Sequence, residues 1–309
     1  MVAPSLVVFF FVYVVSLFLG VGFGDWFVVW LGLEMNMMSF IGMMWVRSEG
    51  GSEESLFSYF FVQSLASGIF LVMIYVGGFV SLALMMKLAV GPFYFWLPSV
   101  MMGLSWMMNF VLITVQSLLP LILLKGVGGL EVMVLGAVSL IVGVMGSFNQ
   151  NSLSALMAYS SVNHSGWMLI AQMFGGVVWM LYYLIYVIVV FPVFLYLGKK
   201  NMEFLGGHGL WNGFFFMLMI LNLAGIPPMM GFVMSWVVLR WVLEMDVVVS
   251  VLMIVSSLMM FYVYVRIVYE DMVGGGESMV WVSEFGWNWL GFAVFLLLGS
   301  LVFPVFVVV

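Results

Sequence analysis

The feature that most constrains this chain is a series of apolar stretches, each about twenty residues long, separated by short polar segments. Hydrophobic residues make up 66% of the 309 residues and charged residues only 6%, whereas ordinary soluble domains carry about 25% charge. A helix needs ~20 apolar residues to cross the hydrocarbon core of a bilayer. The sequence therefore predicts an all-α, polytopic transmembrane bundle, one domain over residues 1–309 with about eleven helices. The net charge of −6 gives no reason to expect a nucleic-acid partner.

The polar segments divide the chain into predicted spans. The fourth span follows Gly77-Gly78 and is interrupted, and the sixth and seventh lie between the glycine loop at Gly126–Glu131 and Met173, on either side of Asn149–Ser152. The remaining predicted spans cover Ser5–Phe23, Trp26–Trp45, Ser55–Val76, Met107–Leu124, Val177–Leu197, Leu210–Met245, Val247–Val268 and Trp289–Val308.

The fourth span contains LMMKLAVGPFYFWLP, in which Lys87 precedes Gly91 and Pro92. A lysine at the centre of an inserted helix costs roughly 2.5–3.5 kcal/mol, and a proline breaks or kinks the helix that carries it. Carbonyls freed by a break must face protein or water, because lipid cannot bond them. A buried cation beside a broken helix is typical of an ion path. The alternative is a lysine that reaches the headgroups from a helix end.

A second interruption is predicted in the ninth span, where AGIPPMMGF places Pro227 and Pro228 in a long apolar stretch. Paired broken helices in the two halves of a chain indicate inverted repeats around a central pathway. The alternative is two independent kinks, since proline and glycine are frequent in membrane helices.

The residues that carry redox and metal chemistry are missing. The chain has no cysteine, so disulfides, iron–sulfur ligands and thiolate metal sites are excluded. Its two histidines, His164 and His208, have no neighbouring ligand cluster. The glycines between Gly20 and Gly24 are not followed by the strand–helix–strand pattern of a dinucleotide site. We expect no metal and no bound cofactor in this chain.

Four stretches together resemble one family, subunit 2 of mitochondrial NADH:ubiquinone oxidoreductase (respiratory complex I). They are WLGLEMNMMSF (Trp30–Phe40), MKLAVGPFYFWLP (Met86–Pro98), NQNSLSALMAYSSVNHSGWM (Asn149–Met168) and NLAGIPPMMGFVMSW (Asn222–Trp236). The resemblance implies an antiporter-like, proton-conducting subunit of eleven spans in the mitochondrial inner membrane. Its partners would be other membrane-arm subunits, lipids, water and protons. The flavin, the iron–sulfur clusters and ubiquinone would belong to the partner subunits.

The resemblance also implies roles for three residues. A glutamate in the second span of the family pairs with a lysine in the broken fourth span, and the matching residues here are Glu34 and Lys87. Burial disfavours a charged lysine and a nearby carboxylate favours it, so withdrawing Glu34 would make Lys87 release its proton. A static ion pair that only fixes helix packing is the alternative. His164 matches a histidine that could relay protons, or it could be a neutral histidine bonded to a neighbouring helix.

Two lysines of the family pattern are absent, because Ser117 and Ser235 stand at their positions. Serine keeps a hydroxyl that can hold water, so both residues are predicted to line the path without a fixed charge. Lys125 and Arg240 lie downstream on the same spans, and Arg240 is the candidate electrostatic stand-in, although arginine hardly gives up a proton. Two other functions stay open. One is a subunit of a cation/proton antiporter of the same fold, and the other is a membrane-arm segment with reduced conduction.

Overall fold

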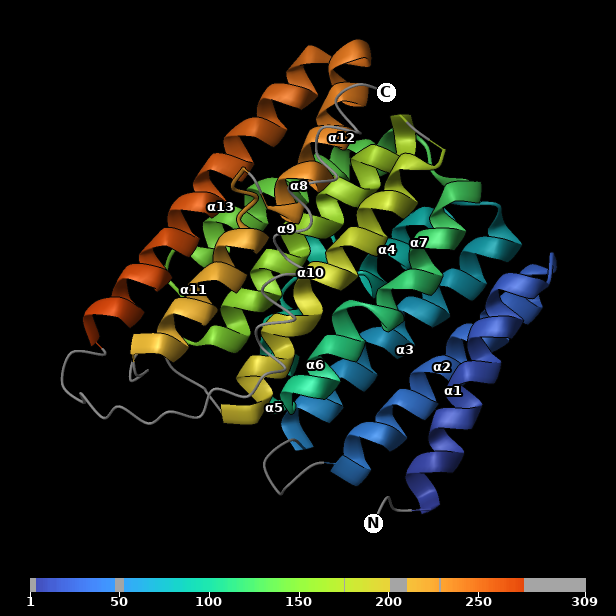
Figure 1. Ribbon diagram of the computed structural model, residues 1–309. Helices are drawn as coiled ribbons and strands as arrows, with labels where there is room; N and C mark the ends of the chain where they lie inside the picture. The colour runs from blue at the N-terminus through green and yellow to red at the C-terminus, as the bar shows by residue number, and fades with distance from the viewer. Residues whose placement is uncertain (1–3, 48–52, 175, 201–209, 228, 275–309) are drawn as a thin grey trace.

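The computed structural model describes residues 4–47, 53–174, 176–200, 210–227 and 229–274, and the elements in this part of the chain are helices (Figure 1). They are α1 (Pro4–Gly22), α2 (Trp26–Arg47), α3 (Glu53–Val76), α4 (Val80–Lys87), a 3₁₀ turn (Gly91–Phe93), α5 (Trp96–Gly103), α6 (Trp106–Ile113), α7 (Val115–Val127), α8 (Leu130–Ser147), α9 (Leu153–Phe174), α10 (Val178–Lys200), α11 (Leu210–Leu223), α12 (Met230–Met245) and α13 (Val247–Gly274).

The helices lie side by side in one elongated bundle, with α1 at one edge and α13 at the other (Figure 1). Within the described residues, seven helical segments are long and apolar enough to cross a membrane, or eight if the bent pair α4 and α5 is one span. Helix α9 lies in the interior and packs against α5, α8, α10 and α12. It is buried along almost its whole length, so its polar residues face protein.

The predicted spans agree with the helices as far as the structure describes them. The first to third, sixth to eighth and tenth predicted spans each correspond to one helix. The predicted last span, Trp289–Val308, lies outside the described residues, so the total of eleven stays a prediction.

The break in the fourth span is confirmed, and α4 and α5 are bent by 94° relative to each other. The helix already ends at Lys87 because Pro92 would clash with the carbonyl of Leu88 in a continued helix. Ala89 takes a left-handed conformation (φ 57°), and the amide of Val90 donates to the carbonyl of Met85 (3.1 Å). This is the hydrogen-bonding pattern of a Schellman motif, which satisfies the last carbonyls of a helix.

The break in the ninth span separates α11 from α12 and ends its first helix in the same way. Gly225 is the left-handed residue (φ 77°), and the amide of Ile226 donates to the carbonyl of Leu221 (3.4 Å). The side chain of Asn222 then accepts a hydrogen bond from the amide of Gly231 at the start of α12 (3.0 Å). Two helices that end inside the bundle therefore share one terminating motif.

The predicted fifth span is confirmed as one segment long enough to cross a membrane, Trp106–Val127, and it consists of two helices, α6 and α7. The break between α6 and α7 lies at Thr114 (φ −106°, ψ −83°), about a turn and a half before Pro120. The carbonyl of Thr114 accepts from the hydroxyls of Ser117 (2.7 Å) and Tyr183 (3.0 Å). The amide of Ser117 also donates to this carbonyl (3.1 Å), so the Thr114 carbonyl at the break accepts from one backbone and two side-chain donors.

Candidate functional site

Lys87 lies at the end of α4 and is held by α3. The amide of the Gln63 side chain donates to the backbone carbonyl of Lys87 (3.2 Å), and the Lys87 ammonium donates to the backbone carbonyl of Gln63 (3.4 Å). Trp96 donates its indole N–H to the carbonyl of Met86 (3.2 Å). Lys87 is only 7% exposed, so it does not extend to the headgroups. The freed carbonyls of the break are thus bonded by protein side chains.

Glu34 lies on α2 and is half-buried. It interacts with Lys87 electrostatically, yet in the described part of the chain no carboxylate lies within 4.0 Å of the Lys87 ammonium. The two residues are therefore near one another without a direct ion pair.

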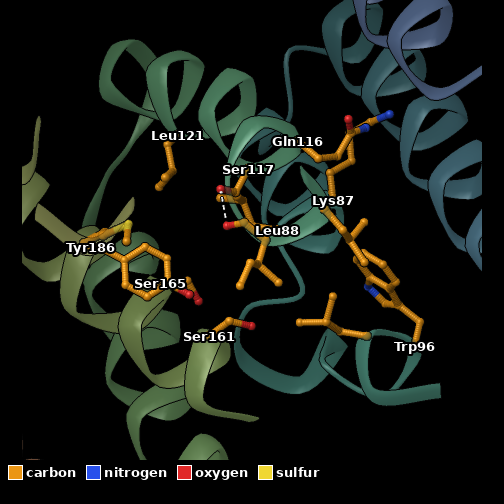
Figure 2. Close-up of a pocket in the computed structure, with 13 residues that line it drawn as sticks. Lys87, Leu88, Trp96, Gln116, Ser117, Leu121, Ser161, Ser165 and Tyr186 are labelled. Carbon is orange, nitrogen blue, oxygen red and sulfur yellow. Dashed lines mark hydrogen bonds between the residues drawn. The ribbon is translucent and has the colours of Figure 1, made fainter. Parts of the chain in front are cut away.

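A cavity of about 30 Å³ lies beside Lys87 (Figure 2). A water needs roughly 10–15 Å³ of such volume, so about two waters fit. Its wall includes Ser117. The residues that line the cavity are Lys87, Leu88, Trp96, Leu97, Leu112, Ile113, Gln116, Ser117, Leu121, Ser161, Ser165, Met168 and Tyr186.

Three serine hydroxyls of this wall already donate to their own helices. Ser117 donates to the carbonyl of Ile113 (2.9 Å; Figure 2), Ser161 to that of Ala158 (2.7 Å) and Ser165 to that of Val162 (2.8 Å). Each oxygen keeps free lone pairs, because a hydroxyl has one hydrogen and two acceptor sites. The serine side of the cavity therefore offers hydrogen-bond acceptors.

Gln116 forms the opposite part of the wall, on the side toward which Lys87 extends (Figure 2). Its carboxamide oxygen accepts from the hydroxyl of Tyr13 on α1 (3.0 Å), and its nitrogen donates to the hydroxyl of Tyr59 on α3 (2.7 Å). This polar bridge ties α7 to two other helices at the depth of Lys87.

A second cavity of about 30 Å³ lies beside the break between α11 and α12. His164 and Ser235 both line it, together with Gly225 and Gly231 of the break. The Nδ1 atom of His164 is hydrogen-bonded to the hydroxyl of Tyr182 on α10 (2.8 Å). This is the kind of contact expected if His164 is a neutral histidine bonded to a neighbouring helix. Its Nε2 atom and the side-chain oxygen of Asn163 are buried without a protein partner, and buried polar atoms of this kind are usually bonded to water.

Helix α9 and Tyr186 of α10 separate the two cavities. Ser161 and Ser165 face the first cavity, whereas Asn163 and His164 face the second. The ring of Tyr186 lines the first cavity and packs against the imidazole of His164, with 4.9 Å between their centroids. The arrangement places one small polar cavity beside each broken helix, with α9 as the wall between them.

Arg240 lies away from this row, which corrects its predicted role as an electrostatic stand-in, and Lys125 also lies away from it. Arg240 is exposed and lines a surface groove with Trp236, Trp241 and Glu244. Lys125 is exposed at the end of α7, where its ammonium donates to the carbonyl of Gly176 (3.2 Å). Each side chain is longer than the radius of its helix, so the place of its charged group depends on which face of the helix carries it. Those faces point outward.

Sequence reasoning missed several polar residues of the site, among them Gln63, Gln116 and Tyr186. Each amide stands within an apolar span, in FFVQSLAS and ITVQSLLP, and a polar residue inside a span is a functional candidate by default. That rule would have found both glutamines. Nothing distinguishes Tyr186 from its neighbouring tyrosines in the sequence.

The described residues contain no group of three or more histidine, aspartate or glutamate side chains that could hold a metal ion. What the arrangement can do is hold water beside a buried ammonium and a buried imidazole.

The chain is similar to one family and to several known proteins. Residues 73–260 match the family model for the transmembrane region of NADH:quinone oxidoreductases and Mrp antiporters. NADH-ubiquinone oxidoreductase chain 2 of Aedes aegypti is 32% identical over 295 residues, which cover 85% of this chain and 84% of that one. The same-named chain of Anopheles gambiae is 30% identical over 289 residues, with 85% of each chain covered.

Two solved structures share the fold. One is respiratory complex I from Thermus thermophilus with bound aureothin (TM-score 0.81, 23% identity, 98% of this chain and 80% of that chain). The other is the Mrp complex from Dietzia sp. (TM-score 0.77, 19% identity, 85% and 60%). The match over most of the chain confirms the resemblance carried by the motifs, and the chain belongs to the NADH-ubiquinone oxidoreductase chain 2 family.

Proposed function

We propose that this chain is a proton-translocating membrane-arm subunit of NADH:ubiquinone oxidoreductase in the mitochondrial inner membrane. The observation that carries the proposal is Lys87, a buried ammonium at the break between α4 and α5 that lines a polar cavity. A buried charge in a membrane is costly and rarely kept without a function. The relatives of this chain are named as chains of a multi-chain oxidoreductase. The other subunits of that complex are the partners of this chain.

Lys87 is the group that holds and releases the proton in this proposal. Glu34 attracts the ammonium, and the cavity with its serine acceptors lies beside Lys87. A movement that separates Glu34 from Lys87 removes a favourable interaction of the charged form, and the proton passes to water in the cavity. His164 accepts or passes a proton beside the second break. Electron transfer, with its flavin, iron–sulfur clusters and ubiquinone, takes place in partner subunits.

The test is proton movement per NADH oxidised in the reconstituted complex carrying Lys87→Met. The expected result is a lower ratio of protons to electrons, while NADH oxidation by a soluble artificial acceptor is unchanged because it needs no membrane subunit. An unchanged ratio in a fully assembled variant complex contradicts the proposal.

A second candidate function is a membrane-arm segment with reduced conduction. The specific observation in its favour is that both lysine positions of the family pattern carry serine, Ser117 and Ser235, and that Arg240 faces outward. Under this candidate, Lys87→Met leaves the proton ratio unchanged and reduces assembly alone. The antiporter alternative needs no NADH-oxidising partner. If the chain co-purifies with NADH-oxidising activity in a large mitochondrial assembly, the antiporter alternative is excluded.

A further inference from the structure

A surface groove between α10 and α12 has no part in either helix break. Its volume is about 440 Å³, and it is lined by Val177, Val178, Leu181, Trp236, Val237, Arg240, Trp241 and Glu244. This volume is in the range of small-molecule sites, about 300–1,000 Å³, and it is more than ten times that of either internal cavity.

The groove has opposite charges arranged along one helix face. Trp236, Arg240 and Glu244 follow each other at intervals of four residues on α12 and therefore lie in one row. Arg240 and Glu244 are both exposed, and in the part of the chain that the structure describes neither has an ion-pair partner within 4.0 Å. The row thus presents one cation and one anion, roughly a helical turn apart, to whatever fills the groove.

The position of the groove is the end of the membrane-spanning segments. Arg240 lies five residues before Met245, the last residue of α12, which is ~7.5 Å along the axis. Val178 is the first residue of α10, so the facing wall is the start of another helix. Headgroups occupy this depth, since the polar layers add roughly 5–7 Å to each side of the hydrocarbon core.

The two tryptophans mark the same depth. Trp236 is 42% and Trp241 is 47% exposed, and tryptophan concentrates at the boundary between hydrocarbon and headgroups. Their indole faces attract cations. Lys125 adds a second positive charge close by, because its ammonium is bonded to the carbonyl of Gly176, the residue before Val177 of the groove.

We propose that this groove binds the headgroup of a zwitterionic glycerophospholipid of the phosphatidylethanolamine type. The lipid phosphate accepts charge-assisted hydrogen bonds from Arg240, and guanidinium matches phosphate in geometry. The ammonium of the headgroup, two carbons away from the phosphate, lies against Glu244 and a tryptophan ring. The apolar side chains Val177, Val178 and Leu181 cover the upper part of the acyl chains. Glu244 selects for the zwitterion because it gives the headgroup ammonium an acceptor, a contact that phosphatidylglycerol and cardiolipin cannot make.

The experiment is photolabelling of the intact complex in phosphatidylcholine vesicles with a phosphatidylethanolamine that carries a photoreactive group near its glycerol. We expect adducts within residues 177–181 or 236–244, and we expect unlabelled phosphatidylethanolamine to compete better than phosphatidylglycerol. The double variant Arg240→Gln, Glu244→Gln removes two charge-assisted contacts and should lower labelling of these segments by at least about tenfold, the factor expected for the loss of one such contact. Arg47→Gln, at the exposed end of α2, is the matched control and should leave labelling unchanged.

Three results overturn the proposal. They are the absence of adducts from both segments of the native complex, equal labelling of the double variant, and better competition by phosphatidylglycerol or cardiolipin. If the double variant does not assemble, competition on the native complex still decides. The proposal does not depend on proton translocation, so it stands or falls separately from the proposed function.

Discussion

Gln63 and Lys87 exchange hydrogen bonds across the break in the fourth span, each donating from its side chain to the backbone carbonyl of the other. This exchange of hydrogen bonds has two structural effects. It bonds a carbonyl that the break sets free, and it holds the Lys87 ammonium on the α3 side of the helix end. Gln63 is therefore a positioning residue for Lys87.

Gln63→Leu should weaken the break without removing the charge. The carbonyl of Lys87 would lose its donor, and a buried unsatisfied group costs ~1–3 kcal/mol. The expected result is a lower melting temperature of the assembled complex in detergent. Ser64→Ala, the next residue along α3, is the control, because its hydroxyl bonds only its own helix. Equal melting temperatures for the Gln63 variant and the native complex would contradict the positioning role.

Gln116→Leu should cost more than Tyr13→Phe. The leucine variant leaves the hydroxyls of both Tyr13 and Tyr59 without their partner, whereas the phenylalanine variant removes one hydroxyl together with its hydrogen bond. At ~1–3 kcal/mol for each orphaned buried group, the leucine variant is expected to be the less stable by at least about 1 kcal/mol. Denaturation in detergent measures the difference, and the reverse order would show that the bridge does not tie the helices together.

Gly231→Ala should prevent correct formation of the second break. A Cβ at this position would clash with the carbonyl oxygen of Asn222, and the backbone there cannot move without losing the bond between Gly231 and the Asn222 side chain. The expected cost is ~3 kcal/mol or more, seen as reduced assembly of the complex. Gly68→Ala, with nothing within 4 Å of its added Cβ, should assemble normally.

Gly225→Ala should destabilise the chain although space is available for the methyl group. The nearest atom would be 3.5 Å away, so the cost comes from the left-handed backbone, ~1–2 kcal/mol for a residue with a Cβ. Ala89→Gly is the reciprocal change at the first break. It relieves the same strain and gives up one buried methyl worth ~0.8 kcal/mol. Thermal unfolding should therefore show a clear loss for Gly225→Ala and a near-neutral result for Ala89→Gly.

Ser161→Ala together with Ser165→Ala should lower the ratio of protons to electrons with little effect on stability. Both hydroxyls bond only their own helix, so folding loses little, while the first cavity loses two acceptors for water. Proton uptake by vesicles containing the complex measures the ratio. Ser64→Ala removes an equivalent hydroxyl that lines neither cavity and should have no effect on the ratio. A double variant with the native ratio would argue for the reduced-conduction candidate.

The sequence was sufficient to predict the two helix breaks and to predict which residues lie on the inner faces of the helices. Pro92 and the AGIPP segment determine where helices must stop. Ser117 and Ser235 each line a cavity, and their part in a proton path stays a prediction. The kink at Thr114 was missed because its partner, Tyr183, is 69 residues away. The direction of Arg240 depends on how α12 is rotated against α10, and that rotation is fixed by packing between helices rather than by residues near Arg240.

The division of the first cavity into two kinds of wall orients whatever water enters it. Lys87 lines one part of the wall, where its ammonium also donates to the carbonyl of Gln63, and the serine oxygens of α9 present lone pairs on another part. A water molecule between them turns its oxygen toward Lys87 and its hydrogens toward α9. Its dipole is therefore set before any proton arrives, and a proton that leaves Lys87 meets a lone pair, while the next hydrogen in line already points away.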